Sequence, residues 1–219
     1  MFVKDYMTRH PIMIAPEMKA AEAQKIMSEN KVRHLPVVGD GKRLVGLVTR
    51  QRLVLKPDAM ASLNVWEITR FLSEMTVRQV MLPAKQVKTI NPSNTFERAA
   101  RILADHKISC LPVLDDDGTV VGILSEVDLL RGIQDMLGMM AEGVRVTMQM
   151  PNKEGEFAKL SSIVAEQGWG IMGIGSYPTP RREGYYQMVL KIPRVTVEQV
   201  HEVLSRVPDQ EIIDIRTVV

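Results

Sequence analysis

Hydrophobic and polar positions recur along this chain at an offset of 76 residues. Residues 16–53 and 92–129 share 11 identities over 38 aligned positions. Nine of these fall on apolar or turn positions: Pro16/Pro92, Ala23/Ala99, Ile26/Ile102, Leu35/Leu111, Pro36/Pro112, Val37/Val113, Val45/Val121, Gly46/Gly122 and Leu53/Leu129. Identity at core and turn positions indicates that a fold is duplicated, because a shared composition alone would not place matches there.

Each copy predicts a helix, a strand, a turn, a second strand and a further helix. In the second copy, apolar spacing predicts a helix over residues 95–105, with Asn94 as its N-cap and Glu97 as the reciprocal partner. The first copy keeps the apolar helix face but has Met18 where the capping asparagine would stand. A proline-containing apolar strand, a Gly/Asp turn and a second apolar strand then predict a hairpin at a sheet edge.

Further segments flank the two copies. Short amphipathic leads, residues 3–7 and 77–81, precede them. Between the copies, residues 53–75 predict a connecting helix with an apolar face formed by Val65, Ile68, Phe71 and Leu72. Trp66 in this segment is interpreted as a packing residue.

A different pattern begins after residue 143. Alternation predicts a strand over residues 144–150, and apolar spacing from Phe157 to Val164 predicts a helix that Gly168 ends. Strands follow over residues 170–176 and 185–192, then a helix capped by Thr196 and Gln199, and a last strand over residues 211–219. The order β-α-β-β-α-β is that of a ferredoxin-like plait.

Composition gives no support to several classes of function. The formal net charge is +2 and the basic residues are interspersed with acidic ones, so we expect no nucleic-acid partner. No run of 18 apolar residues occurs and charges interrupt the N-terminus, so we expect a cytoplasmic protein with no membrane partner. Cys110 is the only cysteine, which excludes an intramolecular disulfide and a cysteine metal cluster. We interpret Cys110 as a packed small hydrophobe.

The duplicated pattern resembles a tandem cystathionine-β-synthase (CBS) domain pair. The residues that carry the resemblance are the Leu-Pro-Val strands and the Gly-x-x-Thr/Ser-x-x-Arg/Asp segments of residues 46–52 and 122–128, each followed by a helix. This resemblance covers roughly residues 1–135 and implies a module that binds adenosine-type nucleotides in its central cleft.

The third segment resembles an ACT domain, a small-molecule sensing module that usually binds amino acids where two plaits meet. The residues concerned are Asn152 and Gly155, between the first strand and helix, and Gly170. The family more often has aspartate at the position of Asn152 and asparagine at that of Gly170. A CBS pair followed by an ACT domain resembles the acetoin-utilisation accessory proteins.

We therefore expect an α/β (α+β) protein with two pseudo-symmetric repeats and a C-terminal plait. The predicted boundaries are 1–75 for the first CBS repeat with its connecting helix, 76–136 for the second, 137–143 for a linker, and 144–219 for the ACT-like domain. We interpret the methionines at 136, 139 and 140 as packing a helix or a dimer seam.

Ser125 and Asp128 are the sharpest candidates for ligand binding. A strand-to-helix junction exposes the Ser125 hydroxyl and main-chain N–H groups to a phosphate, and Asp128 is able to accept both ribose hydroxyls. The alternative is that Ser125 only caps the helix that begins at Glu126, with Asp128 in its first turn. The resemblance implies that Val32, Arg33 and Pro36 of the first copy hold the adenine. Arg33 would also be able to reach the phosphates. The alternative for Arg33 is an exposed strand residue with no role in binding.

The pseudo-symmetric site would combine Thr49 with Ile108, Ser109 and Pro112. Arg52 replaces the aspartate there, and a guanidinium accepts nothing from hydroxyls. We expect this second site to be empty, or to prefer a ligand with extra phosphate, so that each chain has one good nucleotide site.

The sequence favours a non-catalytic regulatory protein that senses AMP, ADP, ATP or S-adenosylmethionine. The plait would supply a second effector site, a dimer contact, or both, with residues 131–143 transmitting the effect. The alternative is a structural dimerising adaptor that recruits a metabolic enzyme without a ligand. We expect no catalytic residues, since no nucleophile stands with a positioned base, and no metal site, since the four histidines lack helical pairing.

Overall fold

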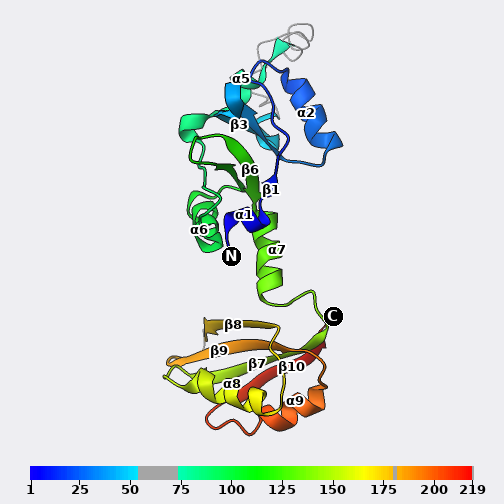
Figure 1. Ribbon diagram of the computed structural model, residues 1–219, viewed down its shortest axis with the longest axis vertical. Coiled ribbons are helices and arrows are strands. Elements are labelled where there is room, and N and C mark those ends of the chain that lie inside the picture. The colour runs from blue at the N-terminus through cyan, green and yellow to red at the C-terminus, as the bar shows by residue number, and fades with distance from the viewer. Residues whose placement is uncertain (54–73, 180–181, 219) are drawn as a thin grey trace. The chain divides into compact units, whose positions relative to one another are not determined.

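The computed structural model describes residues 1–53, 74–179 and 182–218, and the chain divides into two compact units, residues 1–129 and 130–219 (Figure 1). Each unit has its own hydrophobic core. The predicted connecting helix, with Val65, Trp66, Ile68, Phe71 and Leu72, lies outside the described residues.

The first unit contains the duplicated elements. Those of the first copy are α1 (Val3–Tyr6), β1 (Thr8–Arg9), α2 (Ala20–Glu29), β2 (His34–Val38), the 3-10 turn η1 (Asp40–Lys42), β3 (Leu44–Thr49) and α3 (Arg50–Leu53). Those of the second copy are α5 (Val77–Val80), β4 (Leu82–Pro83), the 3-10 turn η3 (Ala84–Gln86), α6 (Phe96–His106), β5 (Cys110–Leu114), β6 (Val120–Ser125) and α7 (Glu126–Met136).

The duplication is confirmed in the strand register. In the first hairpin Pro36 pairs with Leu47, and in the second Pro112 pairs with Ile123 at the equivalent place. Both hairpins shift register at the equivalent place, which is between Val37 and Val38 in the first hairpin and between Val113 and Leu114 in the second. The two copies therefore share their β-bulge as well as their sequence pattern.

The amphipathic leads exchange between the copies. β1 pairs with β6 of the second copy, and β4 pairs with β3 of the first copy. Val3 accordingly lies in the hydrophobic core of the second copy, and Val77 lies in that of the first. From the sequence, each lead was assigned to the copy that follows it, and the exchange was not predicted. In the structure the exchange joins the two copies into one unit.

Gly46 and Gly122 leave room for the exchanged leads. A Cβ atom on Gly46 would lie 2.6 Å from the sulfur of Met81, and one on Gly122 would lie 2.6 Å from the sulfur of Met7. Both distances are far below van der Waals contact, so the glycines at these equivalent positions permit close packing of the leads on the sheets.

The predicted N-cap of α6 is one residue too early. Thr95, not Asn94, caps this helix, and its hydroxyl accepts a hydrogen bond of 3.3 Å from the backbone N–H of Arg98. Glu97 is consequently in the first turn and is not the reciprocal partner. The loss of the cap in the first copy is confirmed, because α2 begins after Lys19 without a side-chain cap.

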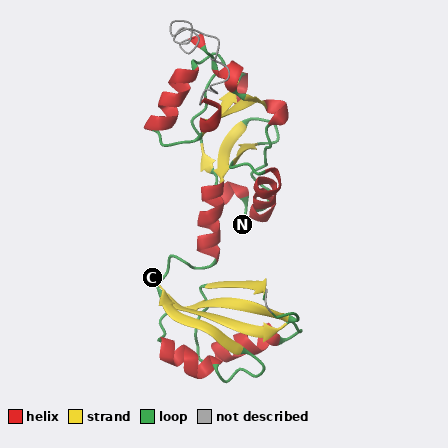
Figure 2. Ribbon diagram, turned by 180° about the vertical axis from the view of Figure 1, so that it is seen from behind, coloured by secondary structure: helices red, strands yellow, loops and turns green. Residues whose placement is uncertain are grey.

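The second unit contains a four-stranded antiparallel sheet with the strand order β10-β7-β9-β8. Figure 2 shows its two helices on one face of this sheet. This is the predicted ferredoxin-like plait, and with the first unit it confirms an α+β fold. Its elements are β7 (Gly143–Pro151), α8 (Glu156–Glu166), β8 (Gly173–Pro178), β9 (Tyr185–Ile192), α9 (Val197–Leu204) and β10 (Glu211–Val218).

Alternation along the strands of the plait places its core on the helical face. Val146 and Met148 of β7 are fully buried in this core with Leu160 of α8 and Leu204 of α9. The predicted capping box of α9 is confirmed, since Thr196 and Gln199 exchange hydrogen bonds of 2.9 and 3.3 Å. The strand predicted over residues 170–176 begins later, at Gly173.

Candidate ligand site

The junction between β6 and α7 holds Ser125 and Asp128. The backbone N–H and the hydroxyl of Ser125 donate to Oδ2 of Asp128 at 2.8 and 2.7 Å, and the N–H of Asp128 lies 3.4 Å from Ser125 Oγ. Asp128 is only 7% exposed. This reciprocal arrangement is a capping box, so the helix-capping role that the sequence allowed is present.

The capping box also fixes the chemistry of the junction. It holds a carboxylate, which is an acceptor, beside a hydroxyl and the N-terminus of an 11-residue helix. Hydroxyl donors and an anionic group are both favourable partners for such a constellation, because the carboxylate accepts from hydroxyls and the helix terminus attracts negative charge. The same two side chains are thus compatible with capping and with ligand binding.

The first-copy candidates lie at the start of β2. Val32 is half-buried, Arg33 is exposed and Pro36 is buried. Their backbones are held in place: the N–H of Arg50 donates to the carbonyl of Arg33 at 2.9 Å, and the N–H of Ile14 donates to that of Pro36 at 3.0 Å. The exposed Arg33 and the half-buried Val32 therefore stand directly before β2, and Pro36 is buried within it.

A direct contact joins the two copies beside these residues. Nε2 of His34 lies 2.8 Å from Oγ of Ser109, 75 positions further along the chain. Burial, and secondarily the charge of Arg33, lowers the pKa of His34 below its usual value. A neutral imidazole is consequently favoured at this contact, and it either donates to or accepts from the serine hydroxyl.

The pseudo-symmetric residues occupy equivalent strand positions but lack the carboxylate. Thr49 pairs with His34 across the first hairpin, while Ile108 and Ser109 are half-buried at the start of β5. Arg52 donates from Nη1 to the backbone carbonyl of Val80 at 3.3 Å. Because Arg52 stands in place of Asp128, the Ser125–Asp128 interaction has no counterpart at Thr49.

The ACT-like candidates are in a loop and a turn of the plait. Asn152 is exposed, and its backbone N–H donates to the carbonyl of Gly184 at 2.8 Å. Gly155 immediately precedes α8 with a φ of +85°, which favours glycine there. Gly170 is exposed, and a Cβ atom added to it would meet no other atom within 4 Å.

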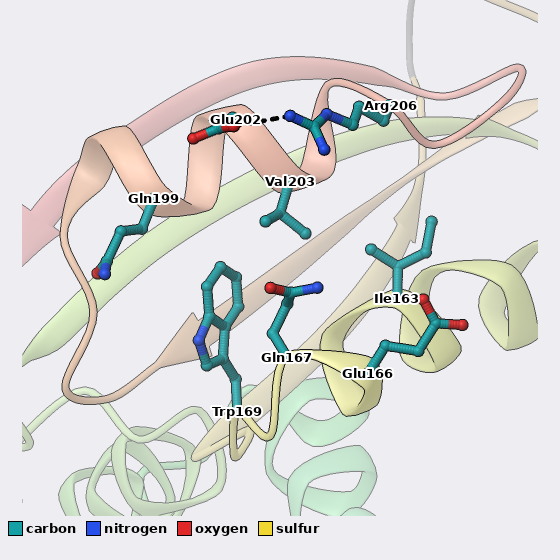
Figure 3. Close-up of a pocket in the computed structure, with 8 residues that line it drawn as sticks. All are labelled: Ile163, Glu166, Gln167, Trp169, Gln199, Glu202, Val203 and Arg206. Carbon is teal, nitrogen blue, oxygen red and sulfur yellow. Dashed lines mark hydrogen bonds and ion pairs between the residues drawn. The ribbon is translucent and has the colours of Figure 1, made fainter.

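A surface hollow that the sequence did not predict lies between α8 and α9. Figure 3 shows Trp169 and Val203 along it, with the ion pair between Glu202 and Arg206 (2.7 Å) at its rim. Its volume is about 460 Å³, and its remaining lining residues are Ile163, Glu166, Gln167 and Gln199. None of these eight side chains is a nucleophile with a positioned base. The only sequence signal is a tryptophan directly after the helix-ending Gly168.

No group of three or more His, Cys, Asp or Glu side chains in the described parts of the chain is arranged to hold a metal ion. No helix among residues 1–53, 74–179 and 182–218 is long and apolar enough to cross a membrane.

Comparison with protein families and solved structures covers the first unit. The family model of the CBS domain matches residues 3–57 and 77–135. The AcuB protein of Vibrio cholerae, named for acetoin utilization, is 28% identical with a TM-score of 0.53 over 64% of this chain and 95% of that chain. CBSX2 from Arabidopsis thaliana, solved in complex with AMP, is 29% identical with a TM-score of 0.50, over 60% of this chain and 94% of that chain.

Curated relatives contain a similar segment within longer chains. The homoserine O-acetyltransferase of Methanohalobium evestigatum is 29% identical over 134 residues, which is 61% of this chain and 24% of that protein. An uncharacterized protein of Methanocaldococcus jannaschii is 31% identical over 135 residues, or 59% of this chain and 46% of that protein. The chain therefore spans 24% of the length of the first relative and 46% of the length of the second.

Proposed function

Because the chain belongs to the CBS domain family and carries a tandem pair, we propose that its first unit binds an adenine nucleotide or related adenosine compound. In this proposal the protein is a regulatory ligand sensor without catalytic activity. The observation that carries it is the buried Asp128 carboxylate held by Ser125 at the start of α7. The AMP complex of CBSX2, a protein with the same pair of domains, supports the choice of ligand.

Each part of the ligand has a residue of suitable chemistry. The two ribose hydroxyls would donate to the carboxylate of Asp128, replacing its bonds from Ser125. The hydroxyl of Ser125 and the N-terminus of α7 would then face the phosphate, together with the exposed guanidinium of Arg33. Val32 and Pro36 would provide an apolar surface for the adenine ring. Thr49, Ile108 and Ser109 belong to the pseudo-symmetric half, where Arg52 disfavours a ribose.

Titration calorimetry with AMP, ADP, ATP and S-adenosylmethionine tests this assignment. Asp128→Ala should weaken binding by about tenfold or more, since it removes hydrogen bonds to a charged acceptor. Asp135→Ala is the matched control, because it removes an exposed aspartate of the same helix and should bind as wild type does. Equal binding by wild type and Asp128→Ala would refute the ribose assignment.

For the second unit we propose an ACT-like effector role in a homodimer. The plait topology and the Asn152–Gly155 loop support this assignment, and the expected ligand is an amino acid. Residues 131–143 would couple the two ligands, and the regulated partner would be a metabolic enzyme, with acetoin utilisation suggested by the likeness to AcuB. A cytoplasmic location fits these roles.

Sedimentation velocity with a panel of the twenty amino acids tests the effector role. An amino acid that the plait binds should shift the monomer–dimer equilibrium of wild type, and Asn152→Ala should abolish the shift. If no amino acid changes the sedimentation or the thermal unfolding of wild type, the plait is not an amino-acid sensor.

A further inference from the structure

Three basic residues form one cross-strand row on the sheet of the plait. Arg216 of β10 pairs directly with Arg145 of β7, and Arg145 pairs directly with Lys191 of β9. Residues paired in this way lie on the same face of a sheet, with neighbouring strands about 4.8 Å apart. We call these three residues the basic row.

The basic row is on the face of the sheet opposite to the helices. Its strand neighbours Val146, Leu190 and Ile192 are buried in the core beneath α8 and α9, and alternation turns Arg145 and Lys191 the other way. Figure 2 shows that the helices of the plait cover only one face. The basic row therefore lies on the face that the plait leaves uncovered by its own helices.

Like charges directly opposite one another destabilise a sheet, so the row requires compensation. One carboxylate supplies part of it: Asp214 accepts from Nη1 of Arg145 at 2.9 Å and from Nε of Arg216 at 2.9 Å. The hydrogen bond from Arg216 is the main cause that lowers the pKa of Asp214 below its usual value, and the charges of both arginines add to it. Asp214 contacts the two arginines of the basic row, so among the ion pairs of the described residues the row carries three positive charges against one negative charge.

Lys191 is the cation that this carboxylate does not reach. Its side chain is 3% exposed, and its ammonium donates to the backbone carbonyl of Met139 at 3.4 Å. Within the described residues no carboxylate forms an ion pair with it. Burying an ammonium beside a neutral carbonyl is costly, and a buried lysine normally acquires an anionic partner.

The segment that supplies Met139 packs closely on this edge of the sheet. A Cβ on Gly173, the residue paired with Lys191 on β8, would lie 2.2 Å from the carbonyl carbon of Leu137. Lys191 is thus closed off on the side of residues 137–139, while Arg145 on its other side is 35% exposed. An entering anion would reach Lys191 from the Arg145 side.

We propose that the basic row binds a small anion with a carboxylate or phosphate group, held between Arg145 and Lys191. The guanidinium of Arg145 has five N–H donors, and its hydrogen bond to Asp214 uses one of them. The anion would give Lys191 the charged acceptor that it lacks and would replace the Met139 carbonyl. This site is separate from the Asn152–Gly155 loop and from the nucleotide residues of the first unit, so it does not depend on the proposed function.

Calorimetric titration of the full chain with inorganic phosphate and with succinate, at constant ionic strength set by chloride, tests the proposal. Wild type should show saturable binding of one of these anions. Lys191→Met keeps an apolar stem of similar length and should weaken binding by about tenfold or more, because a hydrogen bond to a charged group is lost. Arg206→Met is the matched control, since it removes an exposed cation directly after α9, on the opposite face of the same plait, and should leave binding unchanged.

Two further measurements keep the result interpretable. Circular dichroism and thermal unfolding of Lys191→Met without anion show whether this variant is folded. If Lys191→Met is not folded, Arg145→Gln tests the site independently, because it removes the other cation that is proposed to hold the anion. Arg33→Met should retain the anion binding, which separates this site from phosphate binding at the first unit, where the guanidinium of Arg33 is proposed to face the phosphate. Absence of saturable binding in wild type, or equal binding by wild type, Lys191→Met and Arg145→Gln, would overturn the proposal.

Discussion

His34 and Cys110 occupy the same position in the two copies, but their surroundings differ. Cys110 is 4% exposed and packs with Leu47 and Val87 in an apolar cluster between the two hairpins. His34 is half-buried and contacts the hydroxyl of Ser109. The duplicated backbone therefore places the two side chains at equivalent positions, and their contacts differ because each meets different residues of the other copy.

The reactivity of Cys110 follows from this burial. Burial, and secondarily the charge of Glu126, raises the pKa of the Cys110 thiol to about 12. At pH 8 only about one molecule in ten thousand would be a thiolate, compared with roughly a quarter for an ordinary cysteine. Native protein should therefore react very slowly with a thiol reagent such as Ellman's reagent.

Unfolding in guanidinium chloride supplies the control for Cys110. Because this is the only cysteine, one equivalent should react rapidly in the unfolded chain. Rapid stoichiometric labelling of the native protein would contradict the buried placement and would reopen a chemical role for this thiol.

Asp128 and Arg52 are the most informative pair of equivalent residues. Their identities alone allowed the sequence to predict which half of the module favours a ribose, because only the carboxylate accepts hydrogen bonds from hydroxyls. The sequence did not decide between capping and binding for Ser125, and the capping box is present in the structure. The ribose assignment remains a prediction.

At the scale of elements, the spacing of apolar residues predicts where a helix lies but does not decide which residue caps it. Apolar periodicity predicted the body of α6 correctly, but it did not distinguish Asn94 from Thr95 as the cap. Adjacent residues with polar side chains are both suitable N-caps, and the choice depends on the backbone dihedrals at the helix start. Thr95 has the extended φ and ψ of −73° and 154° that a cap requires.

The cap of α6 is open to a direct test by urea unfolding followed with circular dichroism. Thr95→Ala should lower the free energy of unfolding by about 1 kcal/mol, because the N–H of Arg98 loses its acceptor. Asn94→Ala, one residue earlier, should cost less than about 0.5 kcal/mol. A larger decrease in the free energy of unfolding for Asn94→Ala than for Thr95→Ala would indicate that Asn94 caps the helix.

The exchange of the leads could not be predicted from the sequence, for a different reason. Residues 3–7 and 77–81 have similar patterns, so either lead is compatible with either hairpin. Only tertiary packing decides, and here Met7 lies against Gly122 while Met81 lies against Gly46. Similarly, the basic row escaped notice because its three members are far apart in sequence and meet only through strand order.

At the scale of the whole molecule, the protein consists of two compact units with different folds. The first is a CBS pair by fold and by family, and its ligand is proposed from Asp128 and Ser125. The second is a ferredoxin-like plait, for which we propose an ACT-like role and anion binding at the basic row. Helix α7 is continuous from the Ser125–Asp128 junction to Met136, and the proposed coupling of the two ligands would run through residues 131–143.

Equilibrium dialysis of the full chain against labelled AMP tests the central claim most directly, because it counts sites as well as measuring affinity. We predict one molecule of AMP per chain in wild type, and a loss of that binding in Asp128→Ala but not in Asp135→Ala. Two molecules per chain, or one molecule that persists in Asp128→Ala, would contradict the asymmetry between Asp128 and Arg52 on which the account rests.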